Sequence, residues 1–143
     1  MNYQTITLLF VLMAWAPCLF ASERTAQESQ AVRIVDQQLN AYNSQDIEAF
    51  VATYHPEVEI YDFPNQLKYS GRDKLRQNYQ GMFANLKCLN ASSKKRIILN
   101  NTVIDHELAQ MCTTDKNTVD TRIEVIAIYE VEAGLIKRVM FQP

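Results

Sequence analysis

The stretch CLNASSKKRIILNNTVIDHELAQMC, residues 88–112, decides how the second half of this chain folds. Two runs suited to β-strands flank Asn100-Asn101, a dipeptide that fits a two-residue hairpin turn because asparagine tolerates positive φ. The stretch therefore predicts a hairpin whose strands are Cys88–Leu99 and Thr102–Cys112.

The register that this turn imposes is supported by charge. It places Arg96 opposite Asp105 and Lys94 opposite Glu107, and opposite charges that face each other stabilise an antiparallel pair. We interpret both acids as members of solvated salt bridges on one face of the sheet. His106 then lies on the other face, where it is a candidate cavity residue; a hydrogen-bonded core histidine is the alternative.

The two ends of this hairpin carry cysteines. The same register brings Cys88 to within one position of Cys112, so that a single β-bulge would place the two side chains together. In an oxidising compartment such a pair predicts a disulfide. Two separate buried thiols are the alternative.

A second hairpin follows. Thr118–Val131 and Leu135–Phe141 are predicted strands around Ala133-Gly134, in a register that pairs Ile128 with Val139. The C-terminal half is therefore a β-meander.

Helices dominate the region before the meander. Apolar residues at a spacing of 3.6 predict an amphipathic helix over Ala26–Tyr42 and a short second helix capped by Asp46. Val58–Asp62 reads as a strand. The capping-box pattern Ser70-Gly71-Arg72-Asp73 then opens a third helix that ends near Leu86.

The N-terminus is typical of an exported protein. The segment from Ile6 to Ala21 is apolar apart from Thr7, too short for a comfortable membrane span, and fits the core of a secretory signal. We predict a signal peptide at residues 1–21, a polar linker at 22–30 and one folded domain at 31–143. The mature protein is expected in the periplasm or outside the cell, with no membrane partner.

Composition limits the function further. The chain has 143 residues, 48% of them hydrophobic, and a net charge of −2, which favours one globular domain. We see no basic face for nucleic acid, no histidine or cysteine spacing typical of a metal site, and no glycine-rich phosphate loop. The expectation is therefore no nucleic acid, no metal and no cofactor.

One carboxylate has an unusual setting. Asp62 ends the run Val58–Asp62, between Tyr61 and Phe63. In a closed site, burial would raise the pKa of this carboxyl and make it a usable proton acceptor near neutral pH. The alternative is a strand-end acid that accepts backbone N–H bonds before Pro64.

Four segments carry a family resemblance: AYNSQDIEAF (41–50), VEIYD (58–62), SGRD (70–73), and YEV and GLI around the last turn (129–136). Together they resemble the SnoaL-like and ketosteroid-isomerase-like branch of the nuclear-transport-factor-2-like superfamily. The resemblance implies an α+β fold in which three N-terminal helices wrap a curved mixed or antiparallel sheet into a cone around an apolar cavity. It also implies a small hydrophobic ligand and a homodimer formed through the sheet.

The resemblance also implies site residues. Asp62 matches the position of the general base in ketosteroid isomerases, whereas Gln38 and Ala127 occupy the positions of the tyrosine and the acid that hold the enolate oxygen. Besides Asp62 and His106 as catalytic candidates, the residues expected to line the pocket, with ordinary core packing as the alternative, are Gln38, Tyr42, Tyr61, Phe63, Tyr79, Phe83 and Met140.

Two functions remain open at this point. The first is a steroid-isomerase-like or cyclase-like enzyme with Asp62 as general base and His106 or Gln38 orienting the substrate. The second is a non-catalytic module of the same fold that binds a hydrophobic ligand or dimerises. A third, epoxide-hydrolase-like function would need two acids paired with an arginine.

Overall fold

A computed structural model of the chain describes the backbone of residues 17–143 and the side chains of residues 26–143. Most of the predicted signal segment, residues 1–16, lies outside the described residues. The predicted linker at 22–30 is helical, because helix α1 spans Pro17–Asn43. Residues 22–30 contain no proline or glycine and several good helix formers, so nothing stops the helix there. No helix in the described part of the chain is long and apolar enough to cross a membrane.

The two shorter helices begin near their predicted starts. Helix α2, Ile47–Ala52, has Asp46 as its N-cap, whose carboxylate accepts the N–H of Ala49 at 3.0 Å. Helix α3, Arg72–Asn85, is preceded by Gly71 at φ 88°, and no side chain caps it. The predicted capping box is therefore wrong. The N-cap is Gly71 and not Ser70, and its positive φ is a backbone conformation that glycine adopts readily.

Six strands form one sheet. They are β1 Tyr54–Asp62, β2 Gln66–Ser70, β3 Cys88–Leu99, β4 Thr102–Cys112, β5 Thr121–Glu132 and β6 Leu135–Gln142. The order is β2-β1-β6-β5-β4-β3, and only the β1–β6 pair is parallel. The sequence reading missed β2, a short and mostly exposed edge strand in which Leu67 and Tyr69 alternate with polar residues over only five positions.

The first hairpin follows the predicted turn and then departs from the simple register. Arg96 faces Asp105, as predicted, and Asn100 has a positive φ of 55°. A bulge between Ser93 and Lys95 then shifts the ladder by one residue. Beyond the bulge, Ser93 lies opposite Glu107, so the predicted pairing of Lys94 with Glu107 is wrong.

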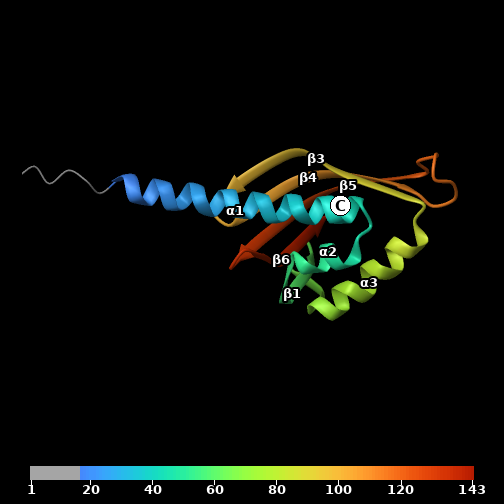
Figure 1. Cartoon of the computed structure of the whole chain (residues 1–143), viewed down its shortest axis with the longest axis horizontal. Coiled ribbons are helices and arrows are strands. Elements are labelled where there is room, and N and C mark those ends of the chain that lie inside the picture. The colour runs from blue at the N-terminus through green and yellow to red at the C-terminus, as the bar shows by residue number, and fades with distance from the viewer. Residues whose placement is uncertain (1–16) are drawn as a thin grey trace, which may run out of the picture.

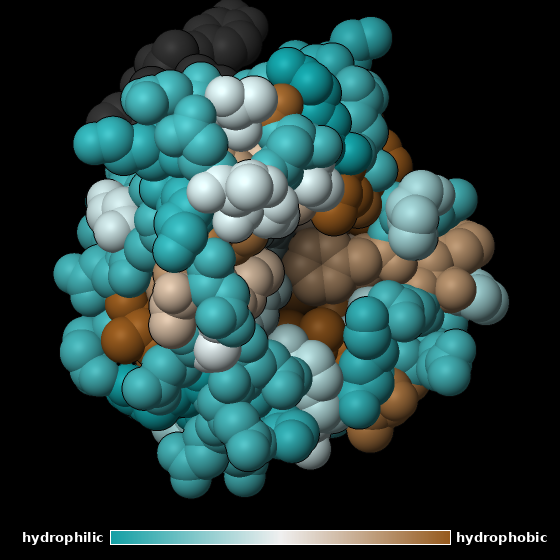
Figure 2. Space-filling view, turned by 90° about the vertical axis from the view of Figure 1, so that its right-hand side faces the viewer, coloured by the Kyte–Doolittle hydropathy of each residue, from teal (hydrophilic) through white to brown (hydrophobic). Residues whose placement is uncertain are grey.

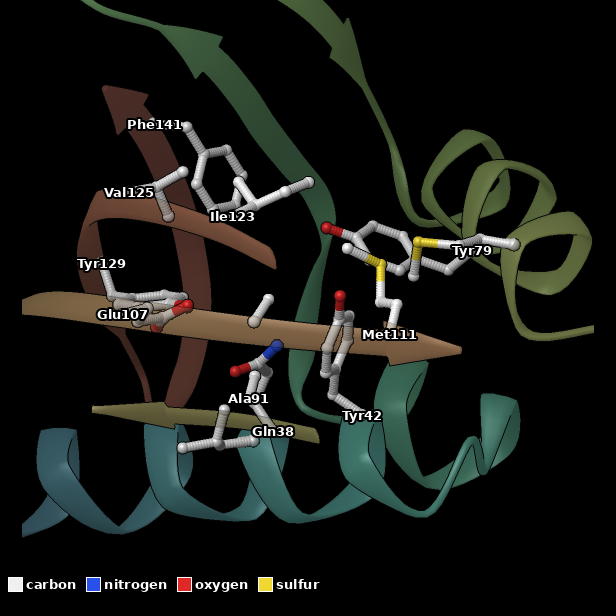
Figure 3. Close-up of a pocket in the computed structure, with 13 residues that line it drawn as sticks. Gln38, Tyr42, Tyr79, Ala91, Glu107, Met111, Ile123, Val125, Tyr129 and Phe141 are labelled. Atoms are coloured by element: carbon white, nitrogen blue, oxygen red, sulfur yellow. The ribbon is translucent and has the colours of Figure 1, made fainter. Parts of the chain in front are cut away.

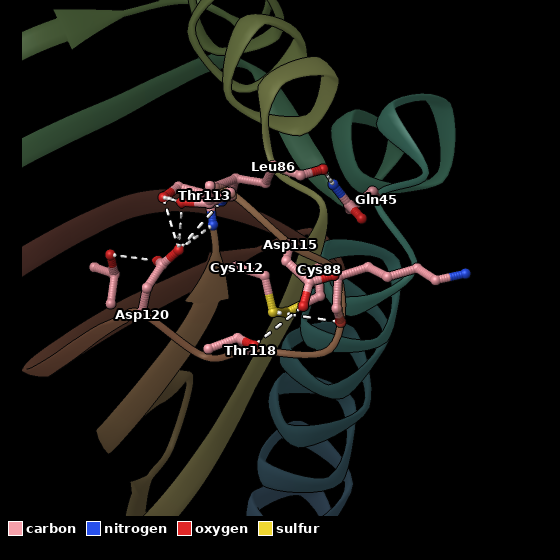
Figure 4. The surroundings of a disulfide bond; sticks show 11 residues. Gln45, Leu86, Cys88, Cys112, Thr113, Asp115, Thr118 and Asp120 are labelled. Atoms are coloured by element: carbon pink, nitrogen blue, oxygen red, sulfur yellow. Dashed lines mark hydrogen bonds between the residues drawn. A yellow bond between two sulfur atoms is a disulfide. The ribbon is translucent and has the colours of Figure 1, made fainter.

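The same bulge aligns the cysteines. Cys88 faces Cys112, and the two are joined in a disulfide across 24 residues of chain. Figure 4 shows this bond at the end of the hairpin, beside the loop that leads to β5. The carboxylate of Asp120 orders that loop, because it accepts hydrogen bonds from the backbone and hydroxyl of Thr113 at 2.9 and 2.8 Å.

The second hairpin is displaced by one residue from the predicted register. Ile128 faces Met140 and Ala127 faces Phe141, because the ladder is irregular between Glu130 and Val131. A shift of one residue exchanges the two faces of a strand. Phe141 consequently points to the interior, and Met140 points to the outer face.

The three helices cover one face of this curved, open sheet (Figure 1). Helix α1 packs against β3 and β4, while α2 and α3 close the side near β1. The core lies between these layers, and its largest fully buried side chains include Phe50, Tyr54, Leu75, Tyr129 and Ile136. The predicted cone-shaped α+β architecture is confirmed.

Candidate active site

A cavity of about 180 Å³ lies between the helices and the inner face of the sheet. Helices α1 and α3 form one side of it, and strands β3 to β6 form the other (Figure 3). The end of the molecule near α3 is hollowed, with hydrophobic surface inside a hydrophilic rim (Figure 2). The lining residues are Gln38, Leu39, Tyr42, Tyr79, Met82, Ala91, Glu107, Ala109, Met111, Ile123, Val125, Tyr129 and Phe141.

Strand β4 supplies the one carboxylate of this lining. Alternate residues of β4 face inward, so that Val103, Asp105 and Glu107 are all buried. Glu107 is 8% exposed, and Asp105 is not exposed at all. The predicted solvated face for these two acids is therefore wrong, because the Arg96–Asp105 face of the hairpin is the inner face.

Glu107 is held by a phenol. The hydroxyl of Tyr129 donates to Oε1 of Glu107 at 2.7 Å, and the two side chains lie together in the cavity wall (Figure 3). Burial raises the pKa of Glu107, the neighbouring charge of Asp105 adds to this, and the Tyr129 hydrogen bond opposes it. The cavity thus presents a carboxyl group whose pKa lies above its usual value.

The tyrosines of the cavity stay protonated. Burial and the charge of Glu107 raise the pKa of Tyr42 to about 12 and raise the pKa of Tyr129 well above its usual value. Burial and neighbouring phenols do the same to the pKa of Tyr79. Each phenol can therefore donate a hydrogen bond but does not act as a base near neutral pH.

Gln38 contributes an amide from helix α1. Its side chain is 5% exposed and points into the cavity between Glu107 and Tyr42 (Figure 3). Oε1 of this amide is buried and has no hydrogen-bond partner among the described residues.

A family model of the SnoaL-like domain matches residues 35–139. The chain belongs to the SnoaL-like family. This match covers most of the predicted domain and confirms the resemblance seen in the sequence.

Solved structures show the same fold. An uncharacterised cystatin-fold protein from Novosphingobium aromaticivorans superposes with a TM-score of 0.70 at 20% identity, covering 79% of this chain and 97% of that one. An LEH-like epoxide hydrolase from M. tuberculosis gives 0.66 at 14% identity, with 80% and 78% covered. A candidate ketosteroid isomerase from Kribbella flavida gives 0.64 at 15% identity, also with 80% and 78% covered. No curated protein matches the chain.

Asp62 lies outside this SnoaL-like cavity. It is not among the lining residues, its side chain is 38% exposed, and Oδ1 is 3.2 Å from the ammonium of Lys68. The expected closed apolar setting is wrong, because β1 ends here at the margin of the sheet, and its neighbour Phe63 is 52% exposed. Lys68 itself lines an adjoining hollow of about 320 Å³, which shares Tyr42, Tyr79, Met82 and Phe141 with the cavity.

His106 faces away from the cavity. It lies on the outer face of β4, where Nε2 is 2.9 Å from a carboxylate oxygen of Glu124. Its neighbours Asp105 and Glu107 point inward, so the alternation of the strand turns the histidine outward. The expectation that His106 occupies the cavity face is wrong.

The predicted lining residues divide into three groups. Gln38, Tyr42 and Tyr79 line the cavity. Phe83 packs behind them, with its ring centroid 5.7 Å from that of Tyr42. The side chains of Tyr61, Phe63 and Met140 do not line the cavity, since Tyr61 stacks under Arg138 and Met140 follows the displaced register of β6.

Two acids and an arginine do occur together, but outside the cavity. The guanidinium of Arg96 donates a hydrogen bond to each carboxylate oxygen of Asp105 at 2.7 Å and a third one to Asp36 of α1 at 2.6 Å. None of the three lines the cavity, so this group fastens α1 to the sheet. Within residues 26–143, no cluster of histidine, cysteine and acidic side chains could hold a metal ion.

Proposed function

We propose that this SnoaL-like protein binds a small, largely apolar molecule in the Glu107 cavity and moves a proton on it. Glu107, held by Tyr129, is the acid–base group of this proposal. The observation that carries it is the position of this buried carboxyl in the wall of an otherwise mostly apolar cavity.

The environment of Glu107 supports acid–base chemistry. A carboxyl group whose pKa is raised by burial exchanges its proton closer to neutral pH, where general acid–base catalysis is most efficient. Asp62 lacks such surroundings, because Lys68 pairs with it at the exposed margin of the sheet. We therefore assign the role expected for Asp62 to Glu107.

The volume of the cavity limits the size of the ligand. A cavity of roughly 150 Å³ holds one benzene ring, and the inner cavity here measures about 180 Å³. One ring or a short branched chain fills this volume. A ligand with fused rings would have to extend into the adjoining hollow beside Lys68 and Tyr69.

Isomerisation of 3-cyclohexen-1-one to the conjugated ketone tests the proposal with a substrate of the right size. Activity that is lost in Glu107→Gln and kept in Asp62→Asn supports Glu107 as the base. Loss in Asp62→Asn alone would return that role to Asp62. The matched control is Glu132→Gln, which changes an exposed residue at the far end of β5.

A binding module without chemistry is the second candidate function. It is favoured by Ala127, a fully buried residue that supplies no hydrogen-bond donor at the position where ketosteroid isomerases carry an acid. Under this alternative, the ketone occupies the cavity, which its NMR shifts would report, but is not isomerised by any variant.

We also propose a homodimer through the outer face of the sheet. One apolar row crosses all six strands at successive register positions, Ile97, Ile104, Ile128, Met140, Tyr61 and Leu67. No described helix covers this face (Figure 1), and Ile97 at the end of the row is 64% exposed. Sedimentation should give a dimer that Ile104→Glu dissociates and that Gln37→Glu, on the exposed side of α1, leaves intact. A monomeric wild type would contradict it.

Export is the remaining part of the proposal. The disulfide supports an oxidising compartment. Expression of the whole chain, followed by fractionation and intact-mass analysis, should give an exported protein that begins at Ser22. A full-length mass confined to the reducing cytosol would contradict it.

A further inference from the structure

Two phenol groups meet where two hollows of the molecule join. The inner cavity of about 180 Å³ and the adjoining hollow of about 320 Å³ share Tyr42, Tyr79, Met82 and Phe141 in their linings. Tyr42 comes from α1 and Tyr79 from α3, and their ring centroids lie 6.1 Å apart in an edge-to-face arrangement. The neck between the two spaces, formed by these shared residues, therefore carries a polar group from each of two helices.

Both phenol hydroxyls are available to a bound molecule. Among the described residues, neither the hydroxyl of Tyr42 nor that of Tyr79 has a hydrogen-bond partner. Protein does not enclose them either, because the fully buried side-chain polar atoms without a partner in residues 26–143 are Oε1 of Gln38 and Nε of Arg72. Figure 3 shows the two hydroxyls pointing from their helices into the cavity. The neck thus offers two hydrogen-bond donors.

Ring packing alone does not account for these hydroxyls. The rings of Tyr42 and Tyr79 pack against Phe50 and Phe83, with centroids 4.5 to 6.0 Å apart. The two phenylalanines are buried and line neither hollow, whereas the two tyrosines line both. Phenylalanine therefore fills the enclosed part of this aromatic cluster, and hydroxyls occur where a ligand would meet them.

The charge around the neck favours a neutral acceptor. Burial raises the pKa of Tyr42 to about 12 and the pKa of Tyr79 well above its usual value, and the charge of Glu107 contributes to both. Both phenols therefore stay protonated, and an anionic group beside them would be repelled by ionised Glu107. A carbonyl oxygen is neutral and has two lone pairs, so it can accept one hydrogen bond from each phenol.

We propose that Tyr42 and Tyr79 together bind one carbonyl oxygen of the ligand, which places one apolar group in the inner cavity and another in the adjoining hollow. The ligand class is therefore a ketone or ester with an apolar group on each side of the carbonyl. This proposal rests on the proposed function of the cavity and names its ligand class. A carbonyl held by two donors also acidifies the neighbouring C–H group, which suits the proton transfer assigned to Glu107.

The two spaces fit the two halves of such a molecule. One aromatic ring fits the inner cavity of about 180 Å³, where Met111 and Val125 would contact it. A short alkyl chain on the other side of the carbonyl would enter the adjoining hollow, whose lining includes Ile60 and Phe141. Butyrophenone, a phenyl ring and a propyl group joined by a carbonyl, has these dimensions.

Butyrophenone and butylbenzene are matched probes for the experiment. They have the same ring and the same four-carbon chain, but only the ketone accepts a hydrogen bond. Their affinities for the purified whole chain would be measured by NMR titration, with the methyl signal of Met111 as the reporter of the inner cavity. Tyr42→Phe and Tyr79→Phe each remove one hydroxyl. The matched control is Tyr61→Phe, whose hydroxyl donates to Glu59 at 3.2 Å and lies outside both hollows.

The expected result is a selective loss of ketone binding. Each of Tyr42→Phe and Tyr79→Phe should weaken butyrophenone about fivefold relative to butylbenzene, and Tyr61→Phe should leave this ratio unchanged. The infrared stretching frequency of carbon-13-labelled carbonyl should be lower in the wild-type complex than in hexane, and it should rise in each of the two cavity variants. The wild-type frequency tests the hydrogen bonds even if a variant fails to fold.

Three outcomes would contradict these claims in different ways. If the ratio of affinities and the carbonyl frequency are the same in the wild type and both cavity variants, the carbonyl proposal is overturned and the cavity function stands. An effect of only one of the two variants would overturn recognition by the pair. If neither probe shifts the methyl signal of Met111, the proposed function of the cavity is itself refuted.

Discussion

Removing the disulfide should lower stability by an amount that the chain itself sets. Cys88 and Cys112 close a loop across a sequence separation of 24. In the chain-entropy model, opening such a loop gives the unfolded chain additional freedom worth about 3.4 kcal/mol at 25 °C. The perturbation is the double variant Cys88→Ala/Cys112→Ala.

The folded state should change little in this variant. The strand pairing around the disulfide extends beyond it, since the backbone N–H of Lys87 donates to the carbonyl of Cys112 at 2.8 Å. Met111, the residue before Cys112, lines the cavity, but it is also held in place by the pairing of β4 with β5. The loss should therefore appear in the free energy of unfolding and leave ligand affinity unchanged.

Urea denaturation measures this directly. We expect the double variant to unfold with about 3 kcal/mol less free energy than the oxidised wild type, and to melt about 10 °C lower. Dithiothreitol should bring the wild type to the level of the variant and leave the variant unaffected. If the mass of the wild type shows an intact disulfide and the double variant still loses less than about 1 kcal/mol of unfolding free energy, the unfolded-state argument is refuted. Loss of near-ultraviolet dichroism in the variant would show that the bond also shapes the fold.

Three further predictions concern the buried charges. Burial raises the pKa of Glu107 above its value in the unfolded chain, so the folded protein keeps a proton that the unfolded chain loses, and stability falls as pH rises from about 4.5 through the folded pKa; urea titrations at several pH values should show this slope vanish in Glu107→Gln. Tyr129→Phe removes the hydrogen bond that lowers the pKa of Glu107, so a carbon-13 titration should find that carboxyl ionising at higher pH than in the wild type. Asp105→Ala leaves Arg96 without its buried partner and should cost about 3–5 kcal/mol, whereas Asp36→Ala, at the exposed side of the same arginine, should cost less than about 1 kcal/mol. Equal losses in these two variants would contradict the burial argument.

The fold could be predicted because its signals are local. The turn at Asn100, the alternation of the long strands and the cap at Asp46 each act on neighbouring residues, and all of them agree with one architecture. The exception is β2, whose alternation covers only five residues and whose pairing with β1 comes from tertiary context.

The site was harder to predict, because the cross-strand partner of each residue depends on the register of the two strands, and one inserted residue changes that register. In an unbroken ladder Lys94 faces Glu107, and the acid then looks like a member of a surface salt bridge. One extra residue in β3 removes that partner, and Lys94 instead pairs with Glu124 at 2.8 Å. The bulge could have been placed from the sequence, since only a bulge brings Cys88 opposite Cys112. It would not have shown that this face is the inner one, because Asp105 keeps its predicted partner Arg96 and is fully buried.

The bulge in β3 has a consequence for how this SnoaL-like chain could be reshaped. Deleting Lys94 would leave every pair of the β3–β4 ladder in place, because Lys95 would follow directly on Ser93 in a regular alternation. What would disappear is the local bend and extra twist that a bulge gives a strand. The curvature of the wall therefore depends on the length of β3, in addition to the residues that line the cavity.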